Sequence, residues 1–149
     1  MKRHEWLLIY LLLPSAKKTS LIDPIRIMKG LFLFKMSYGN LLANFYSFEP
    51  YFYGPCSFEI YDDLLMLEMK GLIYEYSPPL SRWSYYGLTG QGRKIAGEII
   101  NRASRDLVDD LKEIKMKVTG LTFLNLLREV YSLYPEYSKV SLIKFGGRL

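Results

Sequence analysis

The most constraining feature of the sequence is the stretch 57–92, in which a helical pattern gives way to two short strand patterns and then to a second helical pattern. The first helix follows from apolar residues three and four positions apart, which would share one face: Ile60, Leu64 and Leu67. Ser57 stands where a serine commonly caps the start of a helix, and Gly71 stands where a glycine commonly ends one. The stretch therefore predicts one unit built from a helix, a two-stranded ribbon and another helix.

Two strands are expected on either side of a proline-containing loop, at 72–76 and 84–88. Pro78 and Pro79 fix the backbone φ angle and lack the amide donors that a sheet needs, so the loop should project beyond the strands. After the second strand, Thr89 can offer its hydroxyl oxygen to the unpaired amides at the start of the next helix.

The same residues carry a family resemblance. LLMLEMKGLIYEYS at 64–77 and YYGLTGQGRK at 85–94 resemble the "L..LE..GLI...LT..GR" run of winged helix-turn-helix regulators such as the MarR and PadR families. The resemblance covers about a quarter of the chain. It implies a DNA-binding domain in which the two strands form the wing.

A second resemblance extends over most of the chain. The segments IDPIRIMKGLFLF at 22–34, YSFEPYFYGPCSFEIYDDL at 46–64 and VYSLYPEYS at 130–138 are similar to SocA-like (Panacea) antitoxin-type domains. Together, the two resemblances imply an α+β, mainly α fold, namely a winged helix-turn-helix with a two-stranded wing and additional N- and C-terminal helices. Because a fold hosts many functions, they constrain the architecture more than the activity.

Length and composition fit a single domain. The chain has 149 residues, half of them apolar, which is enough to bury one compact core without disulfides or metals. We expect a winged-helix domain over 1–138, with its core at about 23–104 and its C-terminal helices at 90–134. The remaining residues, 139–149, are expected to form a basic, partly flexible tail.

Helices are also expected at 2–13, from Asp23 to residue 37, and at 122–134, while 45–55 is expected to be irregular and aromatic. Asp23 followed by Pro24 is a strong helix start signal. The apolar run near the N-terminus resembles a leader peptide, but Glu5 beside it favours a buried first helix. The run is too short to span a bilayer, so no membrane partner is expected.

A helical pattern without a break is expected from Gly90 to Val118. Its apolar residues recur every three and four positions and form a narrow stripe, which can face a second subunit. The stripe predicts a homodimer through Ile100, Leu107, Leu111 and Ile114.

The charges are distributed in three blocks. Residues 1–50 carry seven Lys and Arg against three acids, and residues 78–105 carry five against one. Between them, residues 51–77 carry five acids and one base. The helix expected at 57–71 occupies the position that enters the DNA major groove in winged helices, yet its outer face should show Glu59, Asp62, Asp63, Met66 and Met69.

Two functions therefore remain open. The leading hypothesis is a transcriptional regulator that binds double-stranded DNA through its backbone and minor groove, using Arg82, Arg93, Lys94, Lys17, Lys18, Arg26 and Lys29. The alternative is a non-catalytic, antitoxin-like module that binds a protein partner or toxin through Tyr51, Phe52, Tyr53, Phe58, Glu59, Asp62, Met66 and Met69. A solvated acidic helix face without any partner is also compatible with the charge pattern.

Catalytic and ligand-binding motifs are sparse. His4 is the only histidine, which leaves nucleophilic triads without a base and zinc sites without ligands. The single cysteine, Cys56, suits a reducing compartment such as the cytoplasm and is expected to pack in the core rather than to sense oxidants. We expect no enzymatic activity, no cofactor and no metal.

Overall fold

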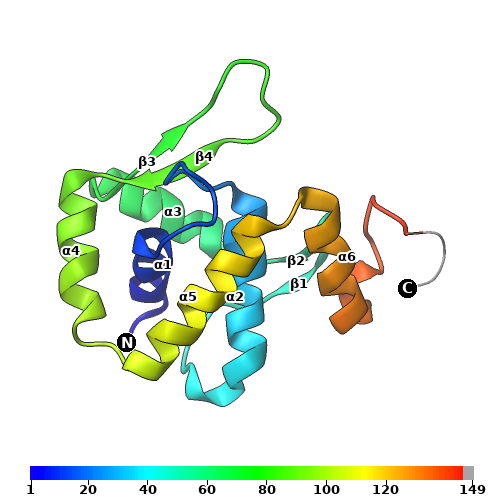
Figure 1. Ribbon diagram of the computed structural model, residues 1–149, viewed down its shortest axis with the longest axis horizontal. Coiled ribbons are helices and arrows are strands. Elements are labelled where there is room, and N and C mark those ends of the chain that lie inside the picture. Colours follow the sequence, from blue (N-terminus) through cyan, green and yellow to red (C-terminus); the bar gives the residue numbers. More distant parts are fainter. Residues whose placement is uncertain (146–149) are drawn as a thin grey trace.

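The computed structural model describes residues 1–145, in which the chain is mainly helical and carries two small antiparallel sheets (Figure 1). The α-helices are α1 (Arg3–Leu12), α2 (Pro24–Tyr38), α3 (Phe58–Met69), α4 (Gly90–Ile100), α5 (Arg105–Gly120) and α6 (Phe123–Leu133). Strands β1 (Glu49–Tyr51) and β2 (Gly54–Cys56) form one sheet, and β3 (Ile73–Tyr76) and β4 (Tyr85–Leu88) form the other. Short 3-10 helices are present at Gly39–Leu41 and Pro135–Ser138. The α+β, mainly α class is confirmed.

Helix α1 lies between α4 and α5, as Figure 1 shows. Its residues from Trp6 to Leu11 are all buried, on every side of the helix, because α2, α4, α5 and β4 pack around it. The buried helix predicted at the N-terminus is thus confirmed. Lys115 of α5 donates its ammonium protons to the carbonyl oxygens of Tyr10, Leu11 and Leu13, which supplies hydrogen bonds at the end of α1.

The unit predicted from 57–92 is present. Strands β3 and β4 pair antiparallel, with Ile73 opposite Leu88, and the loop between them projects from the molecule (Figure 1). The hydroxyl oxygen of Thr89 accepts a hydrogen bond from the amide of Gly92 at 3.0 Å, as expected of an N-cap. Gly71 ends α3 with a φ of 75°, a conformation that favours glycine.

Asp23 and Ser57 precede α2 and α3 as predicted, but neither side chain caps its helix. The Asp23 carboxylate instead forms an ion pair with Arg26, at 3.2 Å between Oδ2 and Nη1. The hydroxyl oxygen of Ser57 is buried without a hydrogen-bond partner among the residues described.

Two expectations about secondary structure were wrong. The aromatic segment expected to be irregular contains the β1–β2 hairpin, in which Glu49 pairs with Cys56 and Tyr51 pairs with Gly54. The helix expected to run unbroken over 90–118 is two helices, because the chain turns at 101–104 before α5 begins. No glycine or proline marks this turn, and the apolar spacing continues across it.

The first part of the expected tail, as far as Phe145, makes contacts with the rest of the chain. Ser141 is buried and accepts a hydrogen bond from the hydroxyl of Tyr131 at 2.6 Å. The amide of Leu142 donates to the carbonyl oxygen of Phe52 at 2.9 Å. The segment after α6 therefore packs against the β1–β2 hairpin, and the rest of the predicted tail, 146–149, lies outside the described residues.

Two glycines of α4 offer a matched test of this packing. A Cβ atom at Gly92 would overlap the carbonyl oxygen of Leu72, whereas a Cβ atom at Gly97 would meet nothing within 4 Å. We expect Gly92→Ala to lower the free energy of unfolding by at least about 2 kcal/mol. Gly97→Ala should raise it by about 0.5–1 kcal/mol, because alanine favours a helix. Urea denaturation of both variants measures the difference, and equal effects would contradict the described fit of α4 against Leu72.

Candidate interaction surface

The outward side of α3 is largely apolar. Side chains at successive helical turns are 41–79% exposed, namely Phe58, Tyr61, Leu65 and Met69. The opposite side of the same helix is buried in the core through Ile60, Leu64 and Leu67. Helix α3 is therefore apolar on two sides, and the fold covers only one of them.

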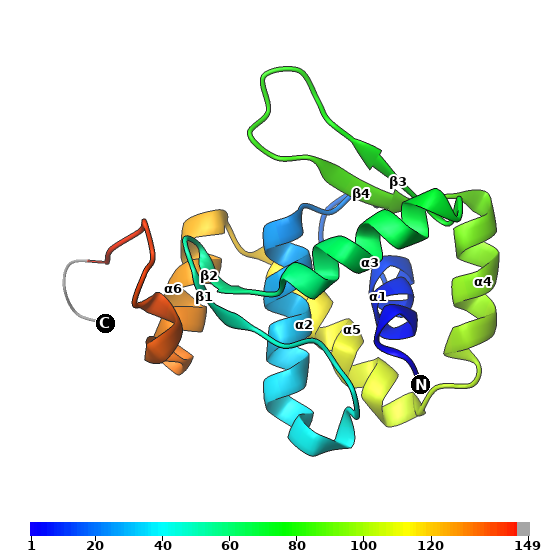
Figure 2. The same ribbon diagram turned by 180° about the vertical axis from the view of Figure 1, so that it is seen from behind.

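The tip of the β1–β2 hairpin extends this exposed surface. The rings of Tyr51 and Phe52 stack with their centroids 4.4 Å apart, and Tyr51 contacts Phe58 edge-on at 5.3 Å. Figure 2 shows the hairpin leading directly into α3 on one side of the molecule. We define the α3 face as Tyr51, Phe52, Phe58, Tyr61, Asp62, Leu65 and Met69. Contiguous exposed apolar surfaces of this kind mark interaction sites.

Two of the acids expected on this surface form ion pairs with Arg3 of α1. Arg3 forms ion pairs with Asp63, at 3.0 Å between Nε and Oδ2, and with Glu59, at 2.9 Å between Nη1 and Oε2. The hydroxyl of Tyr46 donates to Asp63 at 2.7 Å, and the amide of Ser47 donates to Glu59 at 2.7 Å. Asp63 is buried, so the expectation that it is exposed was wrong, whereas the Glu59 side chain remains 39% exposed.

This network fixes the start of α1 against α3. Its hydrogen bonds and charges raise the pKa of the Arg3 guanidinium, chiefly through the hydrogen bond to Asp63. Burial, together with the neighbouring Asp63 carboxylate, raises the pKa of Tyr46. The orientation of α3 is thereby set so that Asp62 and the apolar residues point outward.

The predicted partner-binding residues divide by exposure. Tyr51, Phe52, Phe58, Asp62 and Met69 are exposed, whereas Tyr53, Glu59 and Met66 are half-buried. The sequence analysis missed Tyr61 and Leu65. Tyr61 is three residues from Phe58 and Leu65 is four residues from Met69, so helical spacing was the signal that could have placed them on the same side of α3.

Two of the predicted DNA-binding residues are not available to DNA. Arg26 donates to the carbonyl oxygen of Leu121 at 2.7 Å in addition to its ion pair with Asp23. Lys29 is 1% exposed and donates to the carbonyl oxygen of Pro55 at 3.1 Å. Both side chains bond to backbone carbonyl groups of distant segments. The positions of charges along the sequence could not reveal these contacts. The other five candidates are exposed: Lys17, Lys18, Arg82, Arg93 and Lys94.

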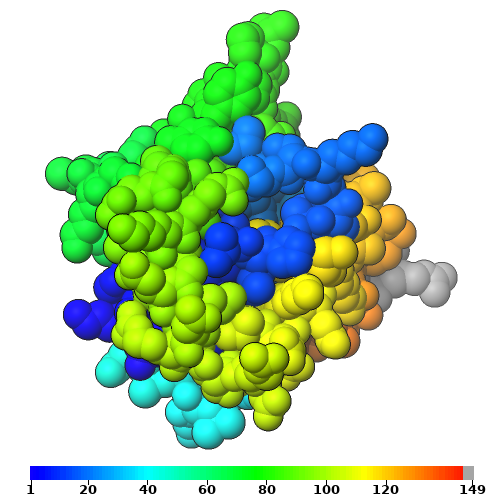
Figure 3. All heavy atoms as spheres, turned by 60° about the vertical axis from the view of Figure 1, so that its left-hand side comes forward, coloured from blue at the N-terminus to red at the C-terminus, as the bar shows by residue number. Residues whose placement is uncertain are grey.

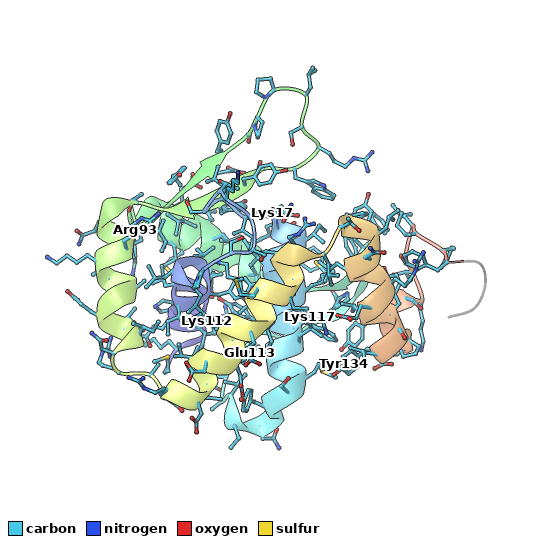
Figure 4. All side chains as sticks on the ribbon, in the orientation of Figure 1. Lys17, Arg93, Lys112, Glu113, Lys117 and Tyr134 are labelled. Atoms are coloured by element: carbon cyan, nitrogen blue, oxygen red, sulfur yellow. The ribbon has the colours of Figure 1, made fainter. Side chains whose placement is uncertain are left out.

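Three of these five bases gather away from the α3 face. Lys17, Lys18 and Arg93 line a shallow hollow of about 180 Å³ between the loop before α2 and α4. Figure 3 shows this loop, in blue, beside α4, in green. Figure 4 labels Lys17 and Arg93 in the orientation of Figure 1, in which α3 lies on the far side of the molecule. We define Lys17, Lys18, Arg93 and Lys94 as the basic surface.

The residues expected to form a dimer interface pack within the chain. Leu111 is fully buried, and Ile100, Leu107 and Ile114 are half-buried against the core around α1. The apolar stripe of α4 and α5 is therefore used to cover α1. The homodimer expected through these residues stays a prediction, with three of the four partly exposed.

Other features give little chemistry. In residues 1–145, no cluster of three or more His, Cys, Asp and Glu side chains is placed to hold a metal ion. Cys56 is buried, and burial raises the pKa of its thiol, as expected for a packing role. No helix within the described range has the length and apolar character to cross a membrane. Comparison with protein-family models, curated proteins and solved structures finds no match.

The adjacent acids of α3 allow a controlled test of the Arg3 network. Asp63→Ala leaves Arg3 and the Tyr46 hydroxyl without their shared partner, and we expect it to lower the free energy of unfolding by about 2 kcal/mol. Asp62→Ala, at the neighbouring exposed position, should change it by less than about 0.5 kcal/mol. Chemical denaturation distinguishes the two. Equal losses, or a larger loss for Asp62, would show that the network does not stabilise the fold.

Proposed function

We propose that the protein is a non-catalytic interaction module whose α3 face binds a protein partner. The observation that carries the proposal is the row of exposed apolar side chains on α3, which continues onto the hairpin tip. The fold does not need these side chains, since the opposite side of α3 already supplies its core residues. Aromatic residues and methionine are enriched at the centres of protein interfaces, which matches this composition.

Charge indicates what the partner should carry. Asp62 is exposed among the apolar residues, and Glu75 is exposed on β3, the strand that follows α3. Lys70 is the one base in 51–77. A partner segment that presents an apolar ridge flanked by Lys or Arg would complement this surface. An antitoxin-type role, which the Panacea resemblance implies, is one form of this proposal.

The same features argue against α3 as a DNA-reading helix. Such a helix lies in a groove lined by phosphates and usually presents Arg, Lys, Asn or Gln. Here the exposed positions hold Tyr61, Leu65 and Met69, with the acid Asp62 between them. The loop that would serve as the wing tip carries Leu80, which is fully exposed.

The test compares two apolar positions of α3 with an apolar position elsewhere. We expect the double variant Leu65→Asp, Met69→Asp to lose partner binding at least about tenfold, which corresponds to about 1.4 kcal/mol. Leu124→Asp, at an exposed position of α6, should bind as the wild type does. Partners recovered with the wild-type protein from its native cells are titrated against all three. Undiminished binding by the double variant would sink the proposal.

A second proposal is nucleic-acid binding by the basic surface, with Arg82 on the wing loop as an additional contact. This proposal is favoured because the four residues of the basic surface and Arg82 are all exposed, and none of the five forms an ion pair within residues 1–145. In this form the protein is a winged-helix regulator that contacts the DNA backbone rather than reading bases. For either function we propose a cytoplasmic location, because a single cysteine suits a reducing compartment.

Salt dependence tests this second proposal. Fluorescence anisotropy of a mixed-sequence duplex should show binding that falls steeply between about 50 and 200 mM salt. Replacing Arg93 and Lys94 with alanine should weaken binding at every sequence and reduce the salt slope by about 1 for each phosphate interaction removed. Lys139→Ala and Lys144→Ala serve as controls. No binding at low salt, or equal effects of all these substitutions, would exclude the basic surface as a DNA site.

A further inference from the structure

Lys29 combines deep burial with few partners. It lies in α2, is 1% exposed, and donates one hydrogen bond among the residues described, to the carbonyl oxygen of Pro55. An ammonium group has three donors, so two of them have no acceptor within 1–145. Burial lowers the pKa of Lys29 to about 7, which reflects the cost of holding its charge away from water.

Lys115 shows how this fold satisfies a buried lysine. Its side chain is as deeply buried as that of Lys29, yet its ammonium donates to three carbonyl oxygens, those of Tyr10, Leu11 and Leu13. Every donor of Lys115 can therefore have an acceptor. Lys29 lacks a comparable set, although it is equally buried.

The groups near Lys29 do not neutralise it. Asp23 is the neighbouring carboxylate, but it already forms the ion pair with Arg26 at 3.2 Å. Cys56 is also close, and burial raises the pKa of its thiol, which keeps the thiol neutral. An anion placed beside Lys29 would supply both the missing acceptors and the missing charge.

Lys29 contributes to the wall of a cavity with mainly aromatic lining. The cavity has a volume of about 170 Å³ and lies between α2, the hairpin, the start of α3 and the base of the wing. Six aromatic side chains line it: Tyr51, Phe52, Tyr53, Phe58, Tyr61 and Trp83. Four of these are exposed, which opens the cavity to the surface. Apolar cavities of about 150 Å³ hold one benzene-sized molecule, so this space suits a single ring or a leucine side chain.

We propose that this cavity binds a carboxylate attached to an apolar group of that size, with the carboxylate on the Lys29 ammonium and the apolar group among the aromatic rings. The carboxylate belongs either to a small molecule or to the C-terminus of a peptide whose last side chain is apolar. This site goes beyond the proposed function, because it is a ligand-binding cavity that lies beneath the hairpin part of the α3 face. Ligand binding to it can be measured with the purified protein, without a protein partner.

A matched pair of ligands provides the first test. Phenylacetate and phenylacetamide have the same shape, and only the first is an anion. Ligand-detected NMR and the fluorescence of Trp83, one of two tryptophans, should show that phenylacetate binds at least about tenfold more tightly than the amide. Equal affinity, or no binding of phenylacetate up to about 10 mM, would overturn the proposal.

Variants then place the ligand. Lys29→Met should lose phenylacetate binding at least about tenfold, while Lys35→Met, in the same helix, should retain it. The α3 variant Leu65→Asp, Met69→Asp should also retain it, because neither residue lines the cavity. Failure of the cavity and failure of the α3 face are thus separate results. If Lys29→Met does not fold, the comparison of acid and amide on the wild-type protein decides alone.

A peptide identifies the source of the carboxylate. A pentapeptide ending in leucine is compared with the same peptide carrying a C-terminal amide. Tighter binding of the free acid than of both phenylacetate and the amide would assign the cavity to a peptide C-terminus. Binding of phenylacetate without binding of either peptide would assign it to a small molecule, and binding of both peptides equally would contradict a role for the carboxylate.

Discussion

Burial of the central part of α1 is the constraint on which the rest of this structure depends. A helix whose residues from Trp6 to Leu11 are buried on every side must be enclosed by other elements, and α2, α4, α5 and β4 do so. Its last carbonyl groups are then shielded from water, and the Lys115 ammonium takes the place of water as their donor. The apolar sides of α4 and α5 pack against α1, so the apolar stripe of these two helices, which includes Leu111, faces the interior.

The same constraint leaves the outward side of α3 free. Arg3, at the start of α1, forms ion pairs with Asp63 and Glu59 of α3. These ion pairs direct both carboxylates toward α1 and away from the apolar residues on the outward side of α3. What remains outside is a row of apolar side chains with Asp62 among them. Since exposed apolar surface of this extent gives no stability to an isolated chain, we interpret it as a contact surface.

Features set by local interactions could be predicted from the sequence. Thr89 as a cap, Gly71 as a helix end and the β3–β4 ribbon depend on residues close in the chain, and all three are present. Features that depend on distant partners could not. The β1–β2 hairpin is held by the segment after α6, through the bond from Leu142 to Phe52. Burial of Lys29 likewise depends on a carbonyl oxygen 26 residues away, which charge pattern cannot reveal.

The most direct test of the α3 face as the functional surface is photo-crosslinking in the cells that produce the protein. Benzoylphenylalanine is placed at Leu65 on the α3 face and, in a separate variant, at Lys94 on the basic surface. We predict a defined protein adduct from position 65, which disappears when Met69→Asp is added. A nucleic-acid adduct from position 94, with no protein adduct from position 65, would contradict this prediction and would assign the function to the basic surface.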